Sequence, residues 1–332
     1  RRTSGVSHVD IQEISMVHDD DPVGAKVTLT DCGTSAITVV QGQRYLLLPR
    51  YKSHQLGQLE RCLQWLDAGG APNPLFLELL HDARLAQRDL TCSSHELAYL
   101  DSIRDQAQLT PSQSEAWDHT FSHRVTAIRG PPGTGKTHLL ASIIVGALAA
   151  AAQDQRACHI YVSAMTHTAI EHLLVKCTLR LKELAPHLSP VLVKLDRWDK
   201  RSRPQEIHVV NKRDLESGLR STQLALVGGT QWALNKLRSS PFDIMVIDEA
   251  SQLLVSHSAL GISRVKPGGR LVVAGDHMQL GPILSEEAQI KGEEAYLSGS
   301  ILDLIRDQPE RPGIQLSQLL ENWRMNQALT EH

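Results

Sequence analysis

From residue 125 onwards, short and mostly apolar runs alternate with longer segments of helical periodicity. The runs share β-branched or aliphatic residues and polar or glycine-rich flanks, and they lie at 125–128, 159–162, 224–227, 244–247, 270–274 and 314–316. Strands that are apolar on both faces are typical of a parallel sheet covered by helices on both sides. The pattern therefore predicts an α/β fold with a doubly wound, mostly parallel sheet.

The first part of the chain has a different pattern. Apolar and polar residues alternate over three short segments, at 25–30, 35–40 and 44–48. Helical spacing then takes over in three further segments, at 58–66, 75–88 and 95–108. Short alternating strands predict a small antiparallel sheet or barrel. We therefore expect a β-barrel-like domain at 1–57, a helical stalk at 58–109 and the parallel-sheet domain at 110–332.

A glycine-rich stretch directly follows the apolar run at 125–128. Residues 130–137 read Gly-Pro-Pro-Gly-Thr-Gly-Lys-Thr and fit the phosphate-binding pattern G-x-x-x-x-G-K-[ST]. Glycines let the backbone curl around a phosphate chain, and the alanine-rich helix predicted at 138–152 adds its positive N-terminal end. In this pattern Lys136 reaches the β- and γ-phosphates, and the Thr137 hydroxyl is a ligand of Mg²⁺. The residues that would form the rest of the cradle are Gly130, Pro131, Pro132, Gly133, Thr134 and Gly135.

Two other strand ends carry candidate chemistry. The run at 244–247 ends in Asp248 and Glu249. One carboxylate at such a place can hold the Mg²⁺ coordination shell, and the next can polarise a water molecule. The run at 270–274 leads into a loop with Gln279, whose amide both donates and accepts hydrogen bonds and suits a γ-phosphate sensor. Considered alone, each could be an ordinary turn.

Two more positions near the predicted site have ordinary explanations of their own. Thr110-Pro-Ser-Gln113 is typical of a helix start in which Gln113 completes a capping box. After the last strand, the Arg324 guanidinium suits phosphate recognition and the Trp323 indole suits stacking on a base. Arg324 on its own would also be explained as a surface residue.

The charge composition does not decide whether the protein binds nucleic acid. The formal net charge of −3 gives no global nucleic-acid signature. Residues 176–213 contain ten Lys or Arg and four Asp or Glu, which fits either a solvated insertion or a surface that faces a polyanion.

The five cysteines are widely spaced and form no C-x-x-C pair, so neither a zinc site nor a disulfide framework is indicated. Reduced thiols and the lack of an N-terminal signal segment predict a protein of the bacterial cytoplasm or of the eukaryotic nucleus or cytoplasm, neither secreted nor in a membrane.

In this order, the motifs resemble those of superfamily 1B helicases, both the nonsense-mediated-decay type and the replication–repair nuclease–helicase type. The resemblance rests on Gln113 and on the stretches at 130–137, 248–252 (Asp-Glu-Ala-Ser-Gln), 275–282 (Gly-Asp-His-Met-Gln-Leu-Gly-Pro) and 323–326 (Trp-Arg-Met-Asn). Thr-His-Thr-Ala-Ile-Glu at 166–171 is similar to a nucleic-acid-contacting motif of this family. The resemblance covers residues 110–326 and extends weakly to 25–105, where the family has a β-barrel and stalk helices.

The resemblance implies a role for each matched residue on the nucleotide side. Gln113 would read the adenine, and Trp323 would pack on the base. Asp248 would hold Mg²⁺ through its water shell, and Glu249 would activate the hydrolytic water. Lys136 and Thr137 keep the roles given above.

On the other side of the nucleotide, Gln279 would couple the state of the γ-phosphate to domain motion, and Arg324 would contact the γ-phosphate. Thr166 and His167 would touch the sugar–phosphate backbone of a single strand, with DNA favoured over RNA.

The resemblance therefore implies the first RecA-like motor domain of a helicase that uses ATP to translocate on and unwind nucleic acid. We expect a fragment, with a second RecA-like domain C-terminal in the same protein and any nuclease domain upstream. Because a missing arginine finger costs about 10³–10⁵ in rate in related enzymes, we expect this chain to bind ATP and hydrolyse it slowly. The alternatives are a nucleotide-gated nucleic-acid-binding or signalling module without unwinding activity, and a AAA+-type assembly ATPase.

Overall fold

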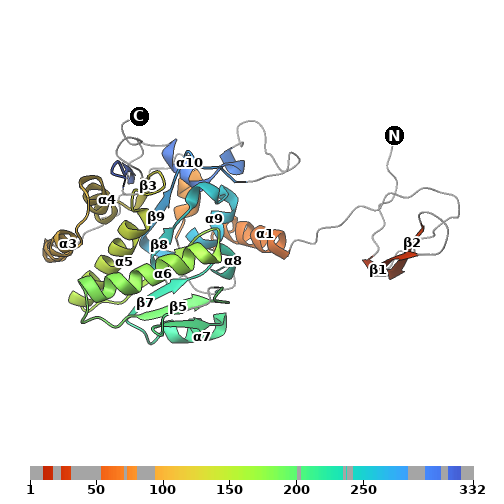
Figure 1. Cartoon of the computed structure of the whole chain (residues 1–332), viewed down its shortest axis with the longest axis horizontal. Helices are drawn as coiled ribbons and strands as arrows, with labels where there is room; N and C mark the ends of the chain where they lie inside the picture. The colour runs from red at the N-terminus through yellow and green to blue at the C-terminus, as the bar shows by residue number, and fades with distance from the viewer. Residues whose placement is uncertain are drawn as a thin grey trace. The chain divides into compact units, whose positions relative to one another are not determined.

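The computed structural model describes the following residues: 10–17, 24–30, 54–70, 73–80, 94–199, 203–234, 237, 242–282, 296–307 and 313–322. The chain divides into two compact units, Arg1–Lys52 and Ser53–His332. In the first unit, β1 (Asp10–Val17) and β2 (Gly24–Thr30) form an antiparallel pair (Figure 1). The strand expected at 25–30 is thus confirmed, β1 was not predicted, and the expected strands at 35–40 and 44–48 lie outside the described residues.

The second unit is built on one sheet of eight parallel strands. Their order across the sheet is β10-β3-β9-β8-β4-β7-β5-β6. The strands are β3 (Val125–Arg129), β4 (Cys158–Ser163), β5 (Val191–Leu195), β6 (Ile207–Val210), β7 (Leu224–Gly228), β8 (Phe242–Ile247), β9 (Val265–Gly275) and β10 (Ile314–Gln318). All six apolar runs lie within strands, so the predicted α/β fold with a doubly wound parallel sheet is confirmed. The sequence pattern missed β5 and β6.

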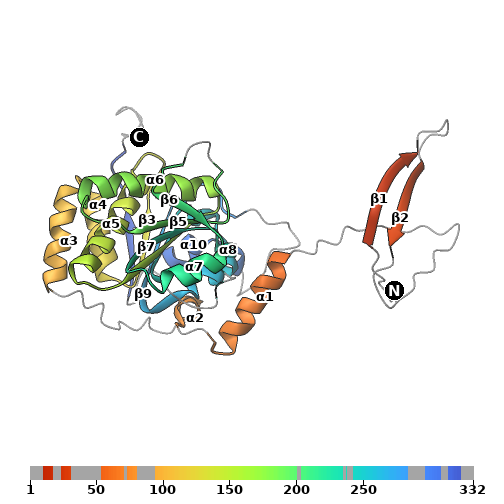
Figure 2. The ribbon, with the colours of Figure 1, turned by 90° about the horizontal axis from the view of Figure 1, so that it is seen from below.

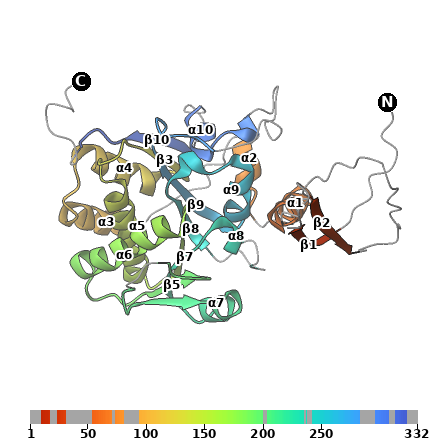
Figure 3. The ribbon, with the colours of Figure 1, turned by 45° about the vertical axis from the view of Figure 1, so that its right-hand side comes forward.

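Helices cover both faces of the sheet (Figures 2 and 3). One face carries α3 (Ser94–Gln106), α4 (Pro111–Ser122), α5 (Lys136–Gln153) and α6 (His167–Leu184). The other carries α1 (His54–Asp67), α2 (Leu75–Leu80), α7 (Lys212–Leu219), α8 (Gln231–Leu234), α9 (Val255–Ile262) and α10 (Ile301–Arg306). Alternate strand residues supply the two cores, since Ile128 packs on the first face while Ala127 packs on the second. This explains why the strands are apolar throughout.

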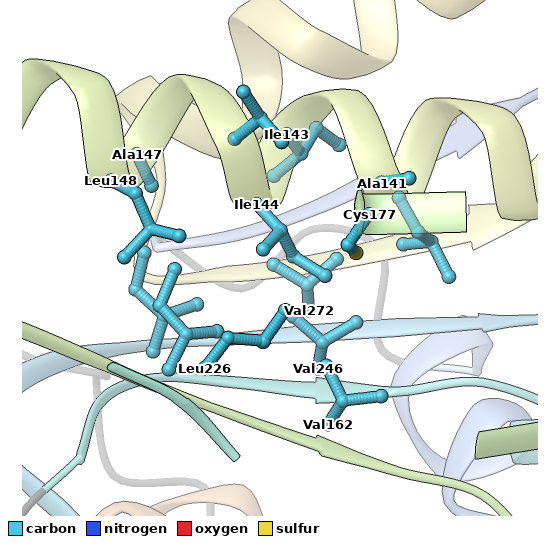
Figure 4. Packing of buried hydrophobic residues seen from close by; sticks show 14 of the residues in the cluster. Ala141, Ile143, Ile144, Ala147, Leu148, Val162, Cys177, Leu226, Val246 and Val272 are labelled. Carbon is cyan, nitrogen blue, oxygen red and sulfur yellow. The ribbon is translucent and has the colours of Figure 1, made fainter. Parts of the chain in front are cut away.

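The central helix α5 is buried against the sheet. Ile144, Ala147 and Leu148 face strand residues such as Val246 and Val272 (Figure 4). By length and composition α5 could cross a membrane, but 72% of its apolar window is buried inside the domain, as in the core helix of a soluble fold. A parallel sheet covered on both faces requires such a helix.

Two helices of the expected stalk dock on the parallel-sheet domain. Helix α1 packs on α9, with the guanidinium of Arg264 4.6 Å from the centroid of the Trp65 ring. At α2, the guanidinium of Arg124 donates to Glu78 (2.8 Å) and to Asn73 Oδ1 (2.7 Å). These contacts hold both helices within the second compact unit. The boundary between stalk and motor at residue 110 stays a prediction.

Candidate active site

The glycine-rich loop connects β3 to α5, as the sequence predicts. Gly133 (φ 95°) and Gly135 (φ 79°) have left-handed backbone conformations, which glycine adopts without steric cost. Lys136 opens α5, and its ammonium donates hydrogen bonds to the carbonyls of Gly130 and Pro131. The loop therefore places a cation and the positive end of an 18-residue helix at one point, which is the arrangement that binds a phosphate chain.

Gln113 braces this loop from α4. Its Oε1 accepts from the Thr110 N–H (3.1 Å), which completes the predicted capping box, and its Nε2 donates to the Thr134 carbonyl (2.9 Å). A Cβ atom on Gly135 would lie 2.5 Å from Nε2, so the close approach requires glycine there. The amide thus has partners within the protein at both ends, and the adenine-reading role of Gln113 stays a prediction.

The segment after β10 lies against the same loop. The Leu319 N–H donates to the Arg129 carbonyl (2.7 Å), and Asn322 Nδ2 donates to the Pro132 carbonyl (3.1 Å). Between them, the Glu321 carboxylate accepts from the Thr110 hydroxyl (2.8 Å). Trp323 and Arg324 come next and lie outside the described residues, so their roles also stay predictions.

Glu321 also binds the first turn of α4, where the Ser112 hydroxyl and N–H both donate to its carboxylate. Burial alone would raise the pKa of Glu321, but the hydrogen bonds from Ser112 and Thr110 outweigh it and the pKa is lowered. A charged Glu321 therefore ties the chain after β10 to the helix that braces the phosphate loop.

Asp248 and Glu249 follow β8 at the same edge of the sheet. The Asp248 N–H donates to the Ser163 carbonyl (2.8 Å) and so continues the pairing of β8 with β4. Asp248 is 7% exposed, and burial raises its pKa, although the Glu249 N–H and the Lys136 ammonium act in the opposite direction. The phosphate loop and the acidic strand end also lie close together, since the Gly130 N–H donates to the Gly275 carbonyl (3.1 Å) and a Cβ atom on Gly275 would lie 3.0 Å from the Ser251 N atom.

Glu249 has a left-handed backbone conformation (φ 54°, ψ 34°), which is uncommon for a residue with a side chain. Burial and the neighbouring Asp248 raise the pKa of its carboxyl group, while a hydrogen bond from the Thr166 side chain lowers it. Thr166 is the N-cap of α6, and its hydroxyl oxygen also accepts from the Ala169 N–H (3.2 Å). The candidate catalytic glutamate is therefore joined to the start of the helix that carries the expected nucleic-acid motif.

His167, the next residue, faces a different partner. Its Nδ1 lies 2.8 Å from the ammonium of Lys194, a fully buried residue at the end of β5. Burial, Lys194 and Arg197 lower the pKa of His167. The expected contact of Thr166 and His167 with nucleic acid stays a prediction.

Gln279 is exposed on the turn that follows β9. The turn is held by Asp276, which accepts from the N–H groups of Met278 (3.0 Å, at Oδ1) and Gln279 (3.1 Å, at the carbonyl). The start of the phosphate loop is next to it, because the Gly130 N–H donates to the Gly275 carbonyl (3.1 Å). Gln279 therefore belongs to the same edge of the sheet as Lys136 and Glu249.

The residues around Asp248 fit a magnesium–nucleotide group. Thr137 is half-buried one residue after Lys136. The buried polar atoms of the described residues that lack a hydrogen-bond partner include three oxygens of residues around Asp248, namely Ser163 Oγ, Ser251 Oγ and Glu249 Oε2. Buried polar atoms are almost always satisfied, so three such atoms beside two carboxylates are typical of a place for water or a polar ligand. Oxygen donors are also the ligands that Mg²⁺ prefers.

The basic segment 176–213 does not form one exposed surface. Lys194 is fully buried, and Arg180 is 6% exposed with its guanidinium bonded to buried groups. Lys182 and Arg197 each pair with an acid of the same segment, at 2.7 and 2.9 Å. Lys200 and Arg201 lie outside the described residues. The hypothesis of a polyanion-facing surface is therefore wrong for Arg180 and Lys194.

Sequence reasoning missed Glu321 and Lys194. Glu321 lies two residues before the candidate stretch at 323–326, but its partners Thr110 and Ser112 are about two hundred residues away. The sequence indicated Lys194 only as one of the ten basic residues of the segment 176–213. Its apolar neighbours Val193 and Leu195 form a strand pattern that could have indicated burial.

Comparison with known proteins agrees with this geometry. The family model described as "AAA domain" matches residues 108–329, about two thirds of the chain. The chain belongs to this AAA-domain family. Nucleotide binding by the phosphate loop follows from membership of this P-loop family.

Two curated relatives of this AAA domain are named as helicases. ATP-dependent helicase NAM7 of Saccharomyces cerevisiae is 29% identical over 69% of this chain and 25% of its own length. The DNA replication ATP-dependent helicase/nuclease DNA2 of the same yeast is 26% identical over 65% of this chain and 13% of its own. The expected membership of superfamily 1 is thereby confirmed, and the chain spans a quarter or less of these two relatives.

One similar solved structure is that of a nuclease-deletion mutant of the Type ISP restriction-modification enzyme LlaGI in complex with a DNA substrate mimic. The matched region covers 68% of this chain and 20% of the LlaGI chain. It is 14% identical with a TM-score of 0.42, a similarity too low to carry an argument.

Proposed function

We propose that this AAA domain is the ATP-hydrolysing first motor domain of a helicase and binds single-stranded nucleic acid at the start of α6. The observation that carries the proposal is the closeness of Thr166 to Glu249, since the Thr166 side chain lowers the pKa of the Glu249 carboxyl group. It joins the motif expected to touch nucleic acid directly to the carboxylate expected to act in hydrolysis. A protein that only bound nucleotide would have no need of this connection.

On the nucleotide side, the backbone of residues 130–135 and Lys136 would hold the phosphates of ATP. Thr137 and Asp248 would hold Mg²⁺, which neutralises charge on the phosphates. Glu249 would orient the attacking water and take its proton, and its raised pKa makes its carboxylate a stronger base than an exposed glutamate. Gln279 would sense the γ-phosphate from the neighbouring strand end.

In a longer protein, a second RecA-like domain would close over this edge of the sheet and complete the ATP site. Exposed apolar side chains on the same edge suit such a contact, since Met278 is 79%, Leu280 85% and Leu320 70% exposed. Binding to DNA is favoured over RNA because the Thr-His pair of the segment 166–171 is more similar to the nuclease–helicase type, and one relative is a DNA replication helicase/nuclease.

The test uses the whole 332-residue chain in single-turnover conditions, with protein in excess over ATP, so that slow hydrolysis is measurable. We expect ATP to bind and be hydrolysed slowly, and E249Q to bind ATP with hydrolysis reduced at least about a hundredfold. Single-stranded oligonucleotides of DNA and RNA are then titrated with ADP or a non-hydrolysable ATP analogue. We expect affinity for the oligonucleotide to differ between the two nucleotides.

Equal hydrolysis by E249Q and the unmodified chain would contradict the role of Glu249. The absence of oligonucleotide binding with every nucleotide would contradict the motor function and leave a nucleotide-binding module. Stronger binding of RNA than of DNA would correct the substrate class alone.

A further inference from the structure

Lys194 is a buried charge outside the nucleotide site. It is the last residue but one of the apolar strand β5 and is 0% exposed, although lysine is among the residues least often buried. Its Nζ lies within hydrogen-bonding distance of three acceptors: His167 Nδ1 (2.8 Å), the Leu195 carbonyl (3.0 Å) and the Arg197 carbonyl (3.1 Å). An ammonium has three N–H donors, so these three acceptors satisfy it completely.

This arrangement defines the tautomer of His167. The carbonyls of Leu195 and Arg197 can only accept, and an ammonium can only donate, so Nδ1 of His167 must accept and the ring proton must be on Nε2. Burial lowers the pKa of Lys194, while Glu171, Asp196 and Asp199 act in the opposite direction and favour its charged form. The Nε2–H of the half-buried ring has no hydrogen-bond partner in the part of the chain that the structure describes.

We propose that Lys194 is a positioning residue, which holds the His167 imidazole so that its Nε2–H donates a hydrogen bond to an oxygen of bound single-stranded nucleic acid. The inference rests on the proposed function and extends it to the chemistry of one contact. The donor is neutral and fixed in orientation, and it stands beside the N-cap that holds Glu249. The nucleic-acid strand would therefore be bound at this point by a hydrogen bond from a neutral, oriented donor, and elsewhere by charged side chains.

The charged groups that face His167 act in both directions on its pKa. Burial lowers the pKa most, Lys194 and Arg197 lower it further, and Asp199 and Glu171 raise it. With a pKa below the ordinary value of about 6.5, the ring is neutral at physiological pH and gains a proton only in acid. The contact should therefore be insensitive to pH between about 6.5 and 8.

The first experiment observes the tautomer directly, by imidazole nitrogen NMR of the full chain with labelled histidine, assigned by the variant H167Q. We expect a neutral ring with the proton on Nε2 at pH 7 in the absence of nucleic acid. In K194M we expect a mixture of tautomers and a higher pKa for His167. A proton on Nδ1 in the unmodified chain, or an unchanged spectrum in K194M, would overturn the proposal.

The second experiment measures the anisotropy of a labelled single-stranded DNA oligonucleotide, at constant ionic strength, from pH 6 to pH 8. A glutamine amide nitrogen can occupy the place of Nε2, whereas an asparagine amide reaches only the place of Nδ1. We therefore expect H167Q to remain within about twofold of the unmodified chain and H167N to lose about tenfold in affinity. Equal losses of DNA affinity in H167Q and H167N would overturn the proposal that the His167 Nε2–H donates to the nucleic acid.

The variant K194M should bind more weakly at pH 8 and regain affinity at pH 6, because its freed imidazole then gains a proton. K182M is the matched control, since Lys182 is an exposed lysine of the same segment with its own acidic partner. We expect K182M to keep the pH profile of the unmodified chain. A K194M profile identical to that of K182M would overturn the proposal. Failure of every protein to bind DNA would contradict the proposed function, while the NMR result would still decide the role of Lys194.

Discussion

The side chain of Thr166 lies beside the carboxyl group of Glu249 and lowers its pKa, and so the N-cap of α6 and the end of β8 share one polar contact. Thr166 and His167 are adjacent, yet one faces Glu249 and the other faces Lys194. The start of α6 is therefore held on two sides by polar groups of neighbouring strand ends. A strand of nucleic acid bound here would affect the contact with Glu249 and the contact with Lys194 at the same time.

The variant T166V tests the contact with Glu249. It keeps the shape of the side chain and removes the hydroxyl, so the carboxylate loses the bond that orients it. We expect the rate of ATP hydrolysis to fall about tenfold with little change in ATP affinity. The single-turnover assay with a fluorescent ATP analogue measures both quantities.

T166S is the matched control for that variant, because serine keeps the hydroxyl and the N-cap. It should hydrolyse ATP within about threefold of the unmodified chain, since the same bond can form. If T166V and T166S had equal rates, the contact would have no part in hydrolysis.

The variant Q113A separates two roles of Gln113. As the brace of the phosphate loop, the amide acts on any nucleotide, because it holds the Thr134 carbonyl of the loop that would bind the phosphates. We expect Q113A to weaken ATP and GTP equally, by about five- to tenfold, in competition binding assays. A loss confined to ATP would instead support the reading of adenine by Gln113.

The sheet was predictable because its strands have a local signature. Residues 244–247 and 271–274 are apolar without interruption, as expected for a sheet covered on both faces. β5 and β6 contain the polar residues Lys194 and His208. These residues interrupt the apolar pattern, so the two strands were not recognised from the sequence. A buried lysine can be recognised only with the partners that satisfy it, and those lie on other elements.

The phosphate loop and Asp248 were predictable for another reason, since their chemistry depends on residues that are consecutive in the chain. Glu321 and its partner Thr110 are 211 positions apart in the chain, and Thr166 and its partner Glu249 are 83 positions apart. No periodicity or local motif encodes such a pairing. The fold must be known before either contact can be identified.

The variant E321Q tests the link between α4 and the segment after β10. The amide is neutral and places an N–H₂ group beside donors, so we expect the free energy of unfolding to fall by about 1–2 kcal/mol at pH 7. The pKa of Glu321 is lowered in the folded protein, so its contribution is complete above the unfolded value of about 4.3 and is lost as pH falls below it.

The stability difference between E321Q and the unmodified chain should therefore stay constant from pH 7 to about pH 5 and shrink as pH falls below about 4.3, as measured by urea unfolding. E60Q, which changes an exposed glutamate of α1, is the control and should leave stability unchanged within about 0.5 kcal/mol. A deficit of E321Q that stayed constant with pH would show that the charge of Glu321 is not what the donors require.

The packing of α5 against α4 gives the last prediction. A Cβ atom on Gly146 would lie 2.3 Å from the Trp117 ring, and Trp117 is 1% exposed and fixed on the other side by Phe121. We expect G146A to lower the free energy of unfolding by about 1–3 kcal/mol, because overpacking outweighs the better helix propensity of alanine. G57A makes the same change in α1, where nothing lies within 4 Å of the new atom, and should stabilise the protein by up to about 1 kcal/mol. Adding W117F to G146A should recover part of the loss, since the smaller ring vacates the space that the methyl group needs. If G146A and G57A changed stability alike in thermal and urea unfolding, the contact between α4 and α5 would be looser than its geometry indicates.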